Sequence, residues 1–240
     1  MPTVFYAGDS TVQYNDISTY PQTGIGQVLP LFLKREVRVE NYARNGRSTK
    51  SFIDESRMVP IYDRITEGDF LLVQFGHNDE KKEDTSRYTE AFGDFQVNLE
   101  KFVNVARNKG AHPVLITPLE RRRLTEDGQL RPCSHGEYPR AVLELGARLG
   151  VPVIDLTALS RKALTEAGPE ETKGWYMHLP AGKYEAHPEG KEDDTHLQYA
   201  GAVIYADLIA RELEKLGGIY ADLLCSREQD KEAFFVGGVM

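Results

Sequence analysis

The sequence is poor in the residues that mark several protein classes. Its only two cysteines, Cys133 and Cys225, lie far apart without metal-type spacing, which argues against a disulfide framework or a cysteine-ligated metal. No apolar run approaches the length needed to cross a membrane. Positive charge is also in deficit, because 37 acidic residues against 29 basic ones give a net charge of −8. We therefore expect neither a membrane protein nor one that coats nucleic acid.

The sequence also lacks internal repeats, low-complexity tracts and linkers. Its 240 residues suit one domain, 1–240, with residues 225–240 as a C-terminal tail. Met1-Pro2 leads directly into an apolar stretch, which predicts a cytoplasmic protein unless a secretory leader was removed. The apolar residues 234–236 (FFV) are expected to dock on this domain or on a second subunit, so an oligomer stays open.

Short apolar runs alternate with longer amphipathic segments along the chain. Strands are expected at 3–7, 36–42, 70–75, 113–117 and 151–156, and helices at 24–35, 88–109, 135–149 and 198–216. Pro30 predicts a kink or a break in the first helix. The alternation predicts a three-layer α/β/α domain with a mostly parallel sheet of about five strands. Residues 80–87 and 168–194 are expected to be loops, the longer one functional because aromatic residues stand among its Gly and Pro.

A serine directly follows the first predicted strand. Gly8 allows a sharp turn there, and Ser10 would then lie at the carboxyl end of the strand, where open α/β sheets bind their ligands. Gly-Asp-Ser alone favours a plain turn with a helix-capping serine. Three later motifs favour a reactive site instead.

Two of these motifs offer hydrogen-bond donors at the ends of other strands. Gly46 follows the second predicted strand, and the backbone freedom of glycine makes its N–H a candidate oxyanion donor. Asn78 follows the third strand and carries a side-chain amide of the same use. Each feature alone is ordinary, since a glycine there is usually a turn and an asparagine a cap.

The third motif is Asp-Asp-Thr-His, just before the last predicted helix. Asp193, three residues before His196, can accept from the ring Nδ1–H and leave Nε2 to take a proton from Ser10. Asp194 is the alternative acid of the triad. It lies two residues before His196, a separation that is expected to direct its carboxylate away from the ring. A metal site built from His187, His196, Asp193 and Asp194 is the alternative, which lacks a paired-histidine spacing.

Together the four motifs resemble those of the GDSL/SGNH hydrolase superfamily, whose blocks supply Ser, Gly, Asn and His in this order. The resemblance spans nearly the whole chain and implies the flavodoxin-like SGNH hydrolase fold. It gives Ser10, Asp193 and His196 as a catalytic triad, and Ser10, Gly46 and Asn78 as the oxyanion hole.

Within the superfamily the chain looks most like the rhamnogalacturonan acetylesterases. The features that carry this likeness are Gly-Asp-Ser-Thr, Asn-x-Ala-x-x-Gly-Arg-Ser, Phe-Gly-His-Asn-Asp and the final Asp-x-Thr-His. The likeness implies removal of acetyl groups from acetylated pectin oligosaccharides, with no metal and no organic cofactor. An esterase for another acetylated sugar, simple ester or lipid is the runner-up, and a non-catalytic carbohydrate-binding relative is the alternative from another class.

Four further residues are candidates for contact with the substrate. His77 precedes Asn78 and could line the site or be structural, and Trp175 and Tyr176 stand in the long aromatic segment. Arg121, the first residue of a triple arginine (121–123), could meet substrate carboxylates or belong to a solvated loop.

Overall fold

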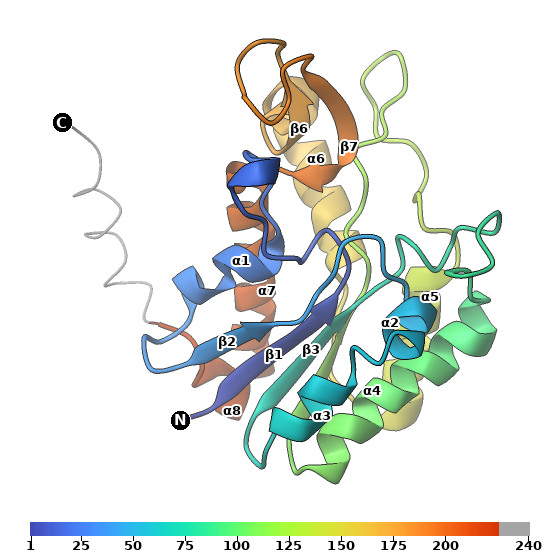
Figure 1. The fold of residues 1–240 in the computed structure, drawn as a ribbon, viewed down its shortest axis with the longest axis vertical. Coiled ribbons are helices and arrows are strands. Elements are labelled where there is room, and N and C mark those ends of the chain that lie inside the picture. Colours follow the sequence, from blue (N-terminus) through green and yellow to red (C-terminus); the bar gives the residue numbers. More distant parts are fainter. Residues whose placement is uncertain (226–240) are drawn as a thin grey trace.

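A computed structural model describes residues 1–225, and its centre is a parallel sheet of five strands in the order β2-β1-β3-β4-β5 (Figure 1). The strands are β1 (Thr3–Gly8), β2 (Arg38–Asn41), β3 (Phe70–Gln74), β4 (His112–Ile116) and β5 (Val153–Ile154). All four neighbouring pairs are parallel. β1 and β3 lie inside the sheet and are almost entirely buried, which explains their continuous apolar sequences.

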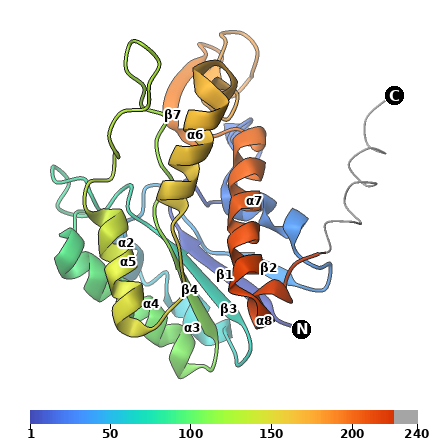
Figure 2. The same ribbon diagram turned by 180° about the vertical axis from the view of Figure 1, so that it is seen from behind.

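Helices cover both faces of this sheet (Figures 1 and 2). One face carries α1 (Ile25–Val28), α6 (Leu156–Lys173) and α7 (Tyr199–Leu216), and the other carries α2 (Thr49–Asp54), α3 (Val59–Arg64), α4 (Gln96–Asn108) and α5 (Tyr138–Leu149). Shorter elements are α8 (Gly218–Ala221), the 3₁₀ turns η1 (Ile17–Thr19) and η2 (Leu29–Phe32), and the π turn η3 (Ala91–Phe95). The predicted three-layer α/β/α architecture with five strands is confirmed.

The hydrophobic core is divided by the sheet into two clusters, and β1 feeds both. Val4 and Tyr6 pack in the cluster under α1, α6 and α7, whereas Phe5 and Ala7 pack in the cluster under α2 to α5. This is the alternation that a strand imposes on consecutive side chains. Burial on both faces fixes the register of β1, and therefore the position of the following Ser10 relative to the ends of the neighbouring strands.

Several predicted elements are shorter than expected, for local reasons. The helix predicted over 24–35 divides into α1 and the 3₁₀ turn η2, which has Pro30 near its start. The helix predicted from residue 88 becomes regular only at Gln96, because Gly93 has non-helical backbone angles. The last strand is limited to two residues, since Asp155 caps α6 by accepting from the Ala158 N–H and Leu156 is already helical.

The loop predicted over 168–194 is wrong. The end of α6 occupies its start, and β6 (Tyr176–Leu179) then pairs antiparallel with β7 (Lys191–Leu197). β7 has the sequence KEDDTHL, whose charged residues hide the strand from a hydrophobic pattern. The β6–β7 ribbon stands beyond the end of the main sheet at which β1 and β3 finish (Figure 1). It is therefore placed to bring side chains toward the segment after β1.

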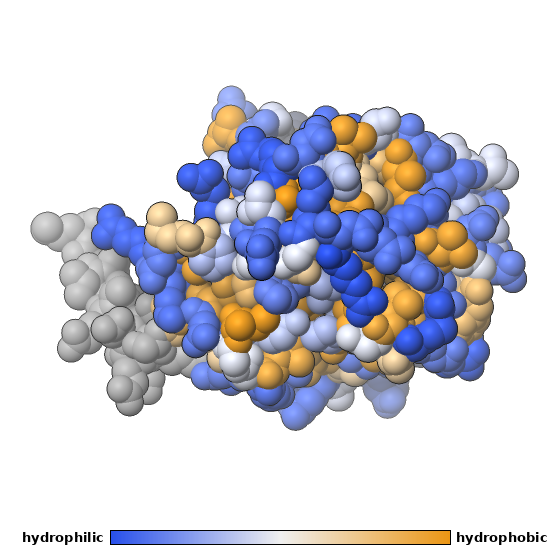
Figure 3. All heavy atoms as spheres, turned by 90° about the horizontal axis from the view of Figure 1, so that it is seen from below, coloured by the Kyte–Doolittle hydropathy of each residue, from blue (hydrophilic) through white to orange (hydrophobic). Residues whose placement is uncertain are grey.

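The opposite end of the molecule, seen in Figure 3, mixes hydrophilic and apolar residues over its surface. Among residues 1–225, no helix has the length and apolar character that crossing a membrane requires. The expected docking segment at 234–236, like the tail from residue 226 on, lies outside the described residues.

Candidate active site

Ser10 lies in a tight turn that follows β1 directly. A side chain at Gly8 would approach the Gln74 carbonyl oxygen to 2.9 Å, so only glycine lets β1 end this close to β3. The Asp9 carboxylate accepts from the Thr11 N–H at 3.0 Å and from its hydroxyl at 2.9 Å. Asp9 therefore organises the turn, and the Ser10 hydroxyl is left for other partners rather than capping a helix.

That hydroxyl is joined to His196 and Asp193 in one hydrogen-bonded series. The Ser10 Oγ lies 2.9 Å from His196 Nε2, and His196 Nδ1 lies 2.7 Å from Asp193 Oδ2. The other carboxylate oxygen of Asp193 accepts from the Thr195 N–H at 2.8 Å and the His196 N–H at 3.0 Å. Burial would raise the pKa of Asp193, but the hydrogen bonds from His196 outweigh it and hold that pKa well below its ordinary value. Such a series can deprotonate a serine hydroxyl and stabilise the resulting imidazolium.

A bulge in β7 makes this series possible. Met177 of β6 pairs with Asp193, yet its neighbour Tyr176 pairs with Leu197, so residues 194–196 bulge out of the ladder. In a regular strand, side chains three residues apart point to opposite faces. The bulge breaks that alternation and lets Asp193 and His196 meet. The predicted contact is therefore present, but a strand bulge creates it and not the three-residue spacing alone.

Asp194, the rival acid, binds different partners. Its Oδ1 lies 2.7 Å from His178 Nε2 and 3.2 Å from Arg122 Nη1, and its carbonyl accepts from the Arg122 N–H at 2.9 Å. The Arg122 guanidinium also donates to the Thr172 hydroxyl and the Pro169 carbonyl. Asp194 thus ties the ribbon to the α6 region.

Gly46 and Asn78 come from two loops that are connected to each other. Gly46 has a φ of +76°, which favours glycine. The Asn78 Nδ2 donates to the Arg47 carbonyl at 3.1 Å, and Arg87 Nη1 donates to Asn78 Oδ1 at 3.3 Å. These two contacts determine which way the amide faces.

Further contacts fix these loops against each other and against the serine turn. The buried Asp79 carboxylate accepts from the Thr49 N–H at 3.0 Å and from the hydroxyls of Thr49 and Thr89 at 2.5 and 2.9 Å. Burial raises the pKa of Asp79 to about 7 despite these bonds. The Arg44 N–H donates to the Gly8 carbonyl at 3.0 Å, which holds the Gly46 loop beside the turn of Ser10.

The predicted aromatic substrate contacts are not available at the surface. Tyr176 is wholly buried, and its hydroxyl lies 2.7 Å from the Glu120 carbonyl and 2.9 Å from the Tyr205 hydroxyl. Trp175 is also buried and packs edge-on against Tyr205, with ring centroids 6.0 Å apart. The expectation that these two side chains hold substrate is therefore corrected: they belong to the core under the ribbon.

The polar candidates His77 and Arg121 are likewise committed to internal contacts. Arg121 is buried and forms an ion pair with Glu80 at 2.6 Å, so it does not present its charge to a substrate. His77 is buried with its ring centroid 4.5 Å from that of His135, and burial lowers the pKa of His77 well below the ordinary value. Both residues support the Asn78 loop from inside.

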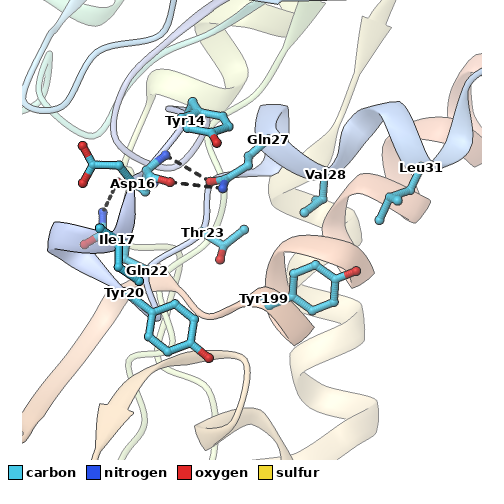
Figure 4. Close-up of a pocket in the computed structure, with 11 residues that line it drawn as sticks. Tyr14, Asp16, Ile17, Tyr20, Gln22, Thr23, Gln27, Val28, Leu31 and Tyr199 are labelled. Atoms are coloured by element: carbon cyan, nitrogen blue, oxygen red, sulfur yellow. Dashed lines mark hydrogen bonds between the residues drawn. The ribbon is translucent and has the colours of Figure 1, made fainter. Parts of the chain in front are cut away.

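No group of three or more His, Cys, Asp and Glu side chains within residues 1–225 is arranged to hold a metal ion. The alternative metal cluster around His187 and His196 is therefore not formed. A pocket of about 670 Å³ is lined by residues between positions 14 and 31 and by the first residue of α7, and Tyr20 and Tyr199 face it (Figure 4).

Three basic residues near the site were not among the predicted site residues. Lys191 Nζ lies 3.0 Å from Asp193 Oδ2, the same oxygen that faces the histidine ring. Arg47 and Arg87 lie around Gly46 and Asn78. Arg47 directly follows Gly46 in the sequence, a signal that was present, whereas Arg87 lies in the expected polar loop 80–87 and Lys191 in the expected loop 168–194, where the aromatic residues alone suggested a role.

Comparison with known proteins identifies close relatives. Residues 6–204 match the model of the GDSL-like Lipase/Acylhydrolase family. The chain is 43% identical to rhamnogalacturonan acetylesterase RhgT of Bacillus subtilis (strain 168), covering 94% of this chain and 95% of the relative. It is 37% identical to the probable rhamnogalacturonan acetylesterase YesY of the same organism, covering 89% and 93%. A solved structure of Axe2, an acetylxylan esterase from Geobacillus stearothermophilus, has a TM-score of 0.60 at 16% identity, covering 94% of this chain and 97% of that one, a likeness of fold alone.

Proposed function

Because the chain belongs to the GDSL-like lipase/acylhydrolase family and is an ester hydrolase, we propose that Ser10 is its nucleophile. His196 then acts as general base, and Asp193 orients the histidine. The observation that carries this assignment is the series from Ser10 Oγ to His196 Nε2 at 2.9 Å and from His196 Nδ1 to Asp193 at 2.7 Å.

The reaction follows the logic of acyl transfer. His196 removes the proton of the Ser10 hydroxyl as Oγ attacks the acetyl carbonyl carbon. The tetrahedral intermediate collapses to an acetyl-serine as His196 protonates the departing sugar hydroxyl. Water, deprotonated by the same histidine, then attacks the acetyl-serine and releases acetate. The low pKa of Asp193 keeps its carboxylate ionised throughout, which stabilises the imidazolium in both steps.

The oxyanion of both intermediates is assigned to three donors. These are the N–H groups of Ser10 and Gly46 and the side-chain amide of Asn78. Support comes from the positive φ of Gly46 and from the contacts of Asn78 with Arg47 and Arg87, which orient its Nδ2. Removal of one such donor typically lowers turnover about a hundred- to a thousandfold.

The substrate we propose is an acetylated pectin oligosaccharide of the rhamnogalacturonan type. Its support is the 43% identity to RhgT across almost the full length of both chains. Other acetylated sugars are the competing substrate class, since the fold is shared with an acetylxylan esterase.

Acetate release from a panel of acetylated oligosaccharides tests this proposal. Acetylated rhamnogalacturonan fragments should be deacetylated faster than acetylated xylan fragments, and the Ser10→Ala variant should release no acetate above background. A preference for xylan fragments would replace the substrate. Activity that survives in Ser10→Ala would remove the nucleophile assignment, and no turnover in any assay would leave a binding relative.

A further inference from the structure

A pocket of about 250 Å³ opens beside Gly46 and is separate from the pocket of Figure 4. Its lining residues are Gly46, Arg47, Ser51, Glu55, Ser86 and Arg87. Gly46 is also assigned to the proposed oxyanion hole, so this Gly46 pocket shares one residue with the proposed catalytic site. Arg87 Nη1 is 3.8 Å from the point where a Cβ of residue 46 would stand.

Arg87 is held in place yet keeps donors to offer. Its Nε lies 2.6 Å from Asp84 Oδ2, its Nη2 lies 2.5 Å from the same oxygen, and its Nη1 donates to Asn78 Oδ1 at 3.3 Å. These contacts engage three of the five N–H groups of a guanidinium. The side chain is 30% exposed, so the rest can meet a ligand.

Arg47 has a similar arrangement on the other side of Gly46. Its Nε and Nη2 each lie 3.0 Å from Glu55 Oε2, and its Nη1 donates to the Asn45 carbonyl at 2.9 Å. Glu55 is shared with Arg57, whose Nε lies 2.6 Å from the same oxygen. Hydrogen bonds from Arg47 and Arg57 lower the pKa of Glu55, so this acidic group stays ionised and is balanced by two guanidinium groups.

The local charge is therefore different from that of the whole chain. The Gly46 pocket gathers two partly exposed guanidinium groups, although the protein carries a net charge of −8. Arg121 and Arg122, by contrast, have side chains only 8% and 7% exposed, and their guanidinium groups are engaged by partners within the protein, Glu80 for Arg121 and Asp194, Thr172 and Pro169 for Arg122. Planar guanidinium groups with free N–H edges are the preferred partners of carboxylates.

We propose that Arg47 and Arg87 bind the carboxylate of a uronate residue in the acetylated oligosaccharide. This inference rests on the proposed function, because galacturonate supplies the carboxylate in pectin. The bound carboxylate would anchor the sugar chain next to Gly46, with the acetyl ester directed toward Ser10. The Gly46 pocket would then favour acidic oligosaccharides over neutral ones.

Calorimetric titration of the full chain with trigalacturonate tests this without using the reaction. The matched ligand is the same trisaccharide with its carboxyl groups reduced to alcohols. We expect trigalacturonate to bind at least about tenfold more tightly than the reduced ligand, and added salt to weaken only the acidic one. Equal binding of the two ligands would overturn the proposal.

Arg47→Gln should weaken trigalacturonate binding about tenfold or more, since it removes a charge-assisted pair. The control is Arg57→Gln, which removes the same charge and a partner of Glu55 but no group that lines the pocket, and its effect should stay under about threefold. Equal effects of the two variants would contradict the assignment. If Arg47→Gln does not fold, Arg47→Lys is the second variant. It keeps the charge but loses the paired N–H donors of the guanidinium, so binding should still fall severalfold.

The proposed function can fail separately. Wild-type protein that binds trigalacturonate through Arg47 but releases no acetate from acetylated rhamnogalacturonan would keep the Gly46 pocket and reject the substrate proposal. Protein that releases acetate but binds acidic and reduced trisaccharides alike would keep the substrate proposal and reject carboxylate binding in the Gly46 pocket.

Discussion

The carboxylate of Asp193 accepts from both the ring and the backbone N–H of His196, at 2.7 and 3.0 Å. The two contacts use different oxygens, so the ring and its own backbone are held by one group. Asp194, one residue later, turns to His178 and Arg122 instead.

Replacement of the two aspartates should therefore have very different consequences. Asp193→Asn should lower kcat by about ten-thousandfold, as when a triad acid becomes an amide, because the amide can neither fix the tautomer nor stabilise the imidazolium. Asp194→Asn should lower kcat far less, because it only weakens the contacts of the β6–β7 ribbon with His178 and Arg122. Steady-state kinetics on p-nitrophenyl acetate measures both, and a larger loss in Asp194→Asn would exchange their roles.

The pH profile gives a second view of the same pair. In Asp193→Asn, the acidic limb of kcat/KM should move to lower pH, since a neutral neighbour no longer favours the charged ring. An unmoved limb would mean that His196 does not set it.

Replacement of Lys191 should move the acidic limb of kcat/KM in the opposite direction, to higher pH. Its ammonium lies 3.0 Å from the oxygen of Asp193 that faces the ring, and it opposes a positive charge on His196. Asp9 and His77 also lie within electrostatic reach of His196. Lys191→Met should move the acidic limb about half a unit to higher pH at low salt, less at high salt. Lys173→Met is the control, because Lys173 pairs with Glu170 instead, and a shift of equal size there would rule out a local effect.

Asp79 should make stability depend on pH. Its pKa in the folded chain is raised to about 7, above the unfolded value of about 3.9, so its contribution is fully present below about pH 4 and is lost as pH rises through 7. Asp79→Asn should remove a slope of at most about 1.4 kcal/mol per pH unit in that range. Urea unfolding of both proteins between pH 4 and 8 measures it, with the exposed Asp63→Asn as control. Parallel curves for wild type and Asp79→Asn would refute the buried, protonated carboxyl.

Prolonged treatment with a chelator should leave esterase activity unchanged. Protein groups fill each role of the proposed mechanism, so no step calls for a Lewis acid. Activity measured after exhaustive dialysis against EDTA provides the test. A loss that one particular metal ion restores would revive a metal role near His187.

The strands and the order of the polar motifs could be predicted because they depend on local rules. Continuous apolar runs such as 70–75 leave few alternatives to a buried parallel strand, and residues that follow such strands meet at one sheet edge. That rule places the segments of Ser10, Gly46 and Asn78 at one end of the sheet, because they follow β1, β2 and β3. The contact of Ser10 with His196 does not follow from it, because His196 lies in β7, whose bulge depends on pairing with β6.

The contacts that were missed depend on tertiary packing. Tyr176 looks like an exposed loop aromatic in sequence, but pairing in the ribbon turns it onto Tyr205. Arg121 and Arg87 are both arginines in polar segments, and only the position of Glu80 and Asp84 decides which one is buried and which keeps a free edge. Charge patterns alone do not contain that choice.

The bond between Ser10 and His196 joins positions 186 residues apart in the chain. During synthesis the proposed nucleophile emerges with the first strand, and its proposed base follows only when nearly all of the sheet and its helices have been made. Hydrolysis through this pair is thus among the last properties that the growing polypeptide can acquire, because a chain that ends before residue 196 carries Ser10 without the histidine.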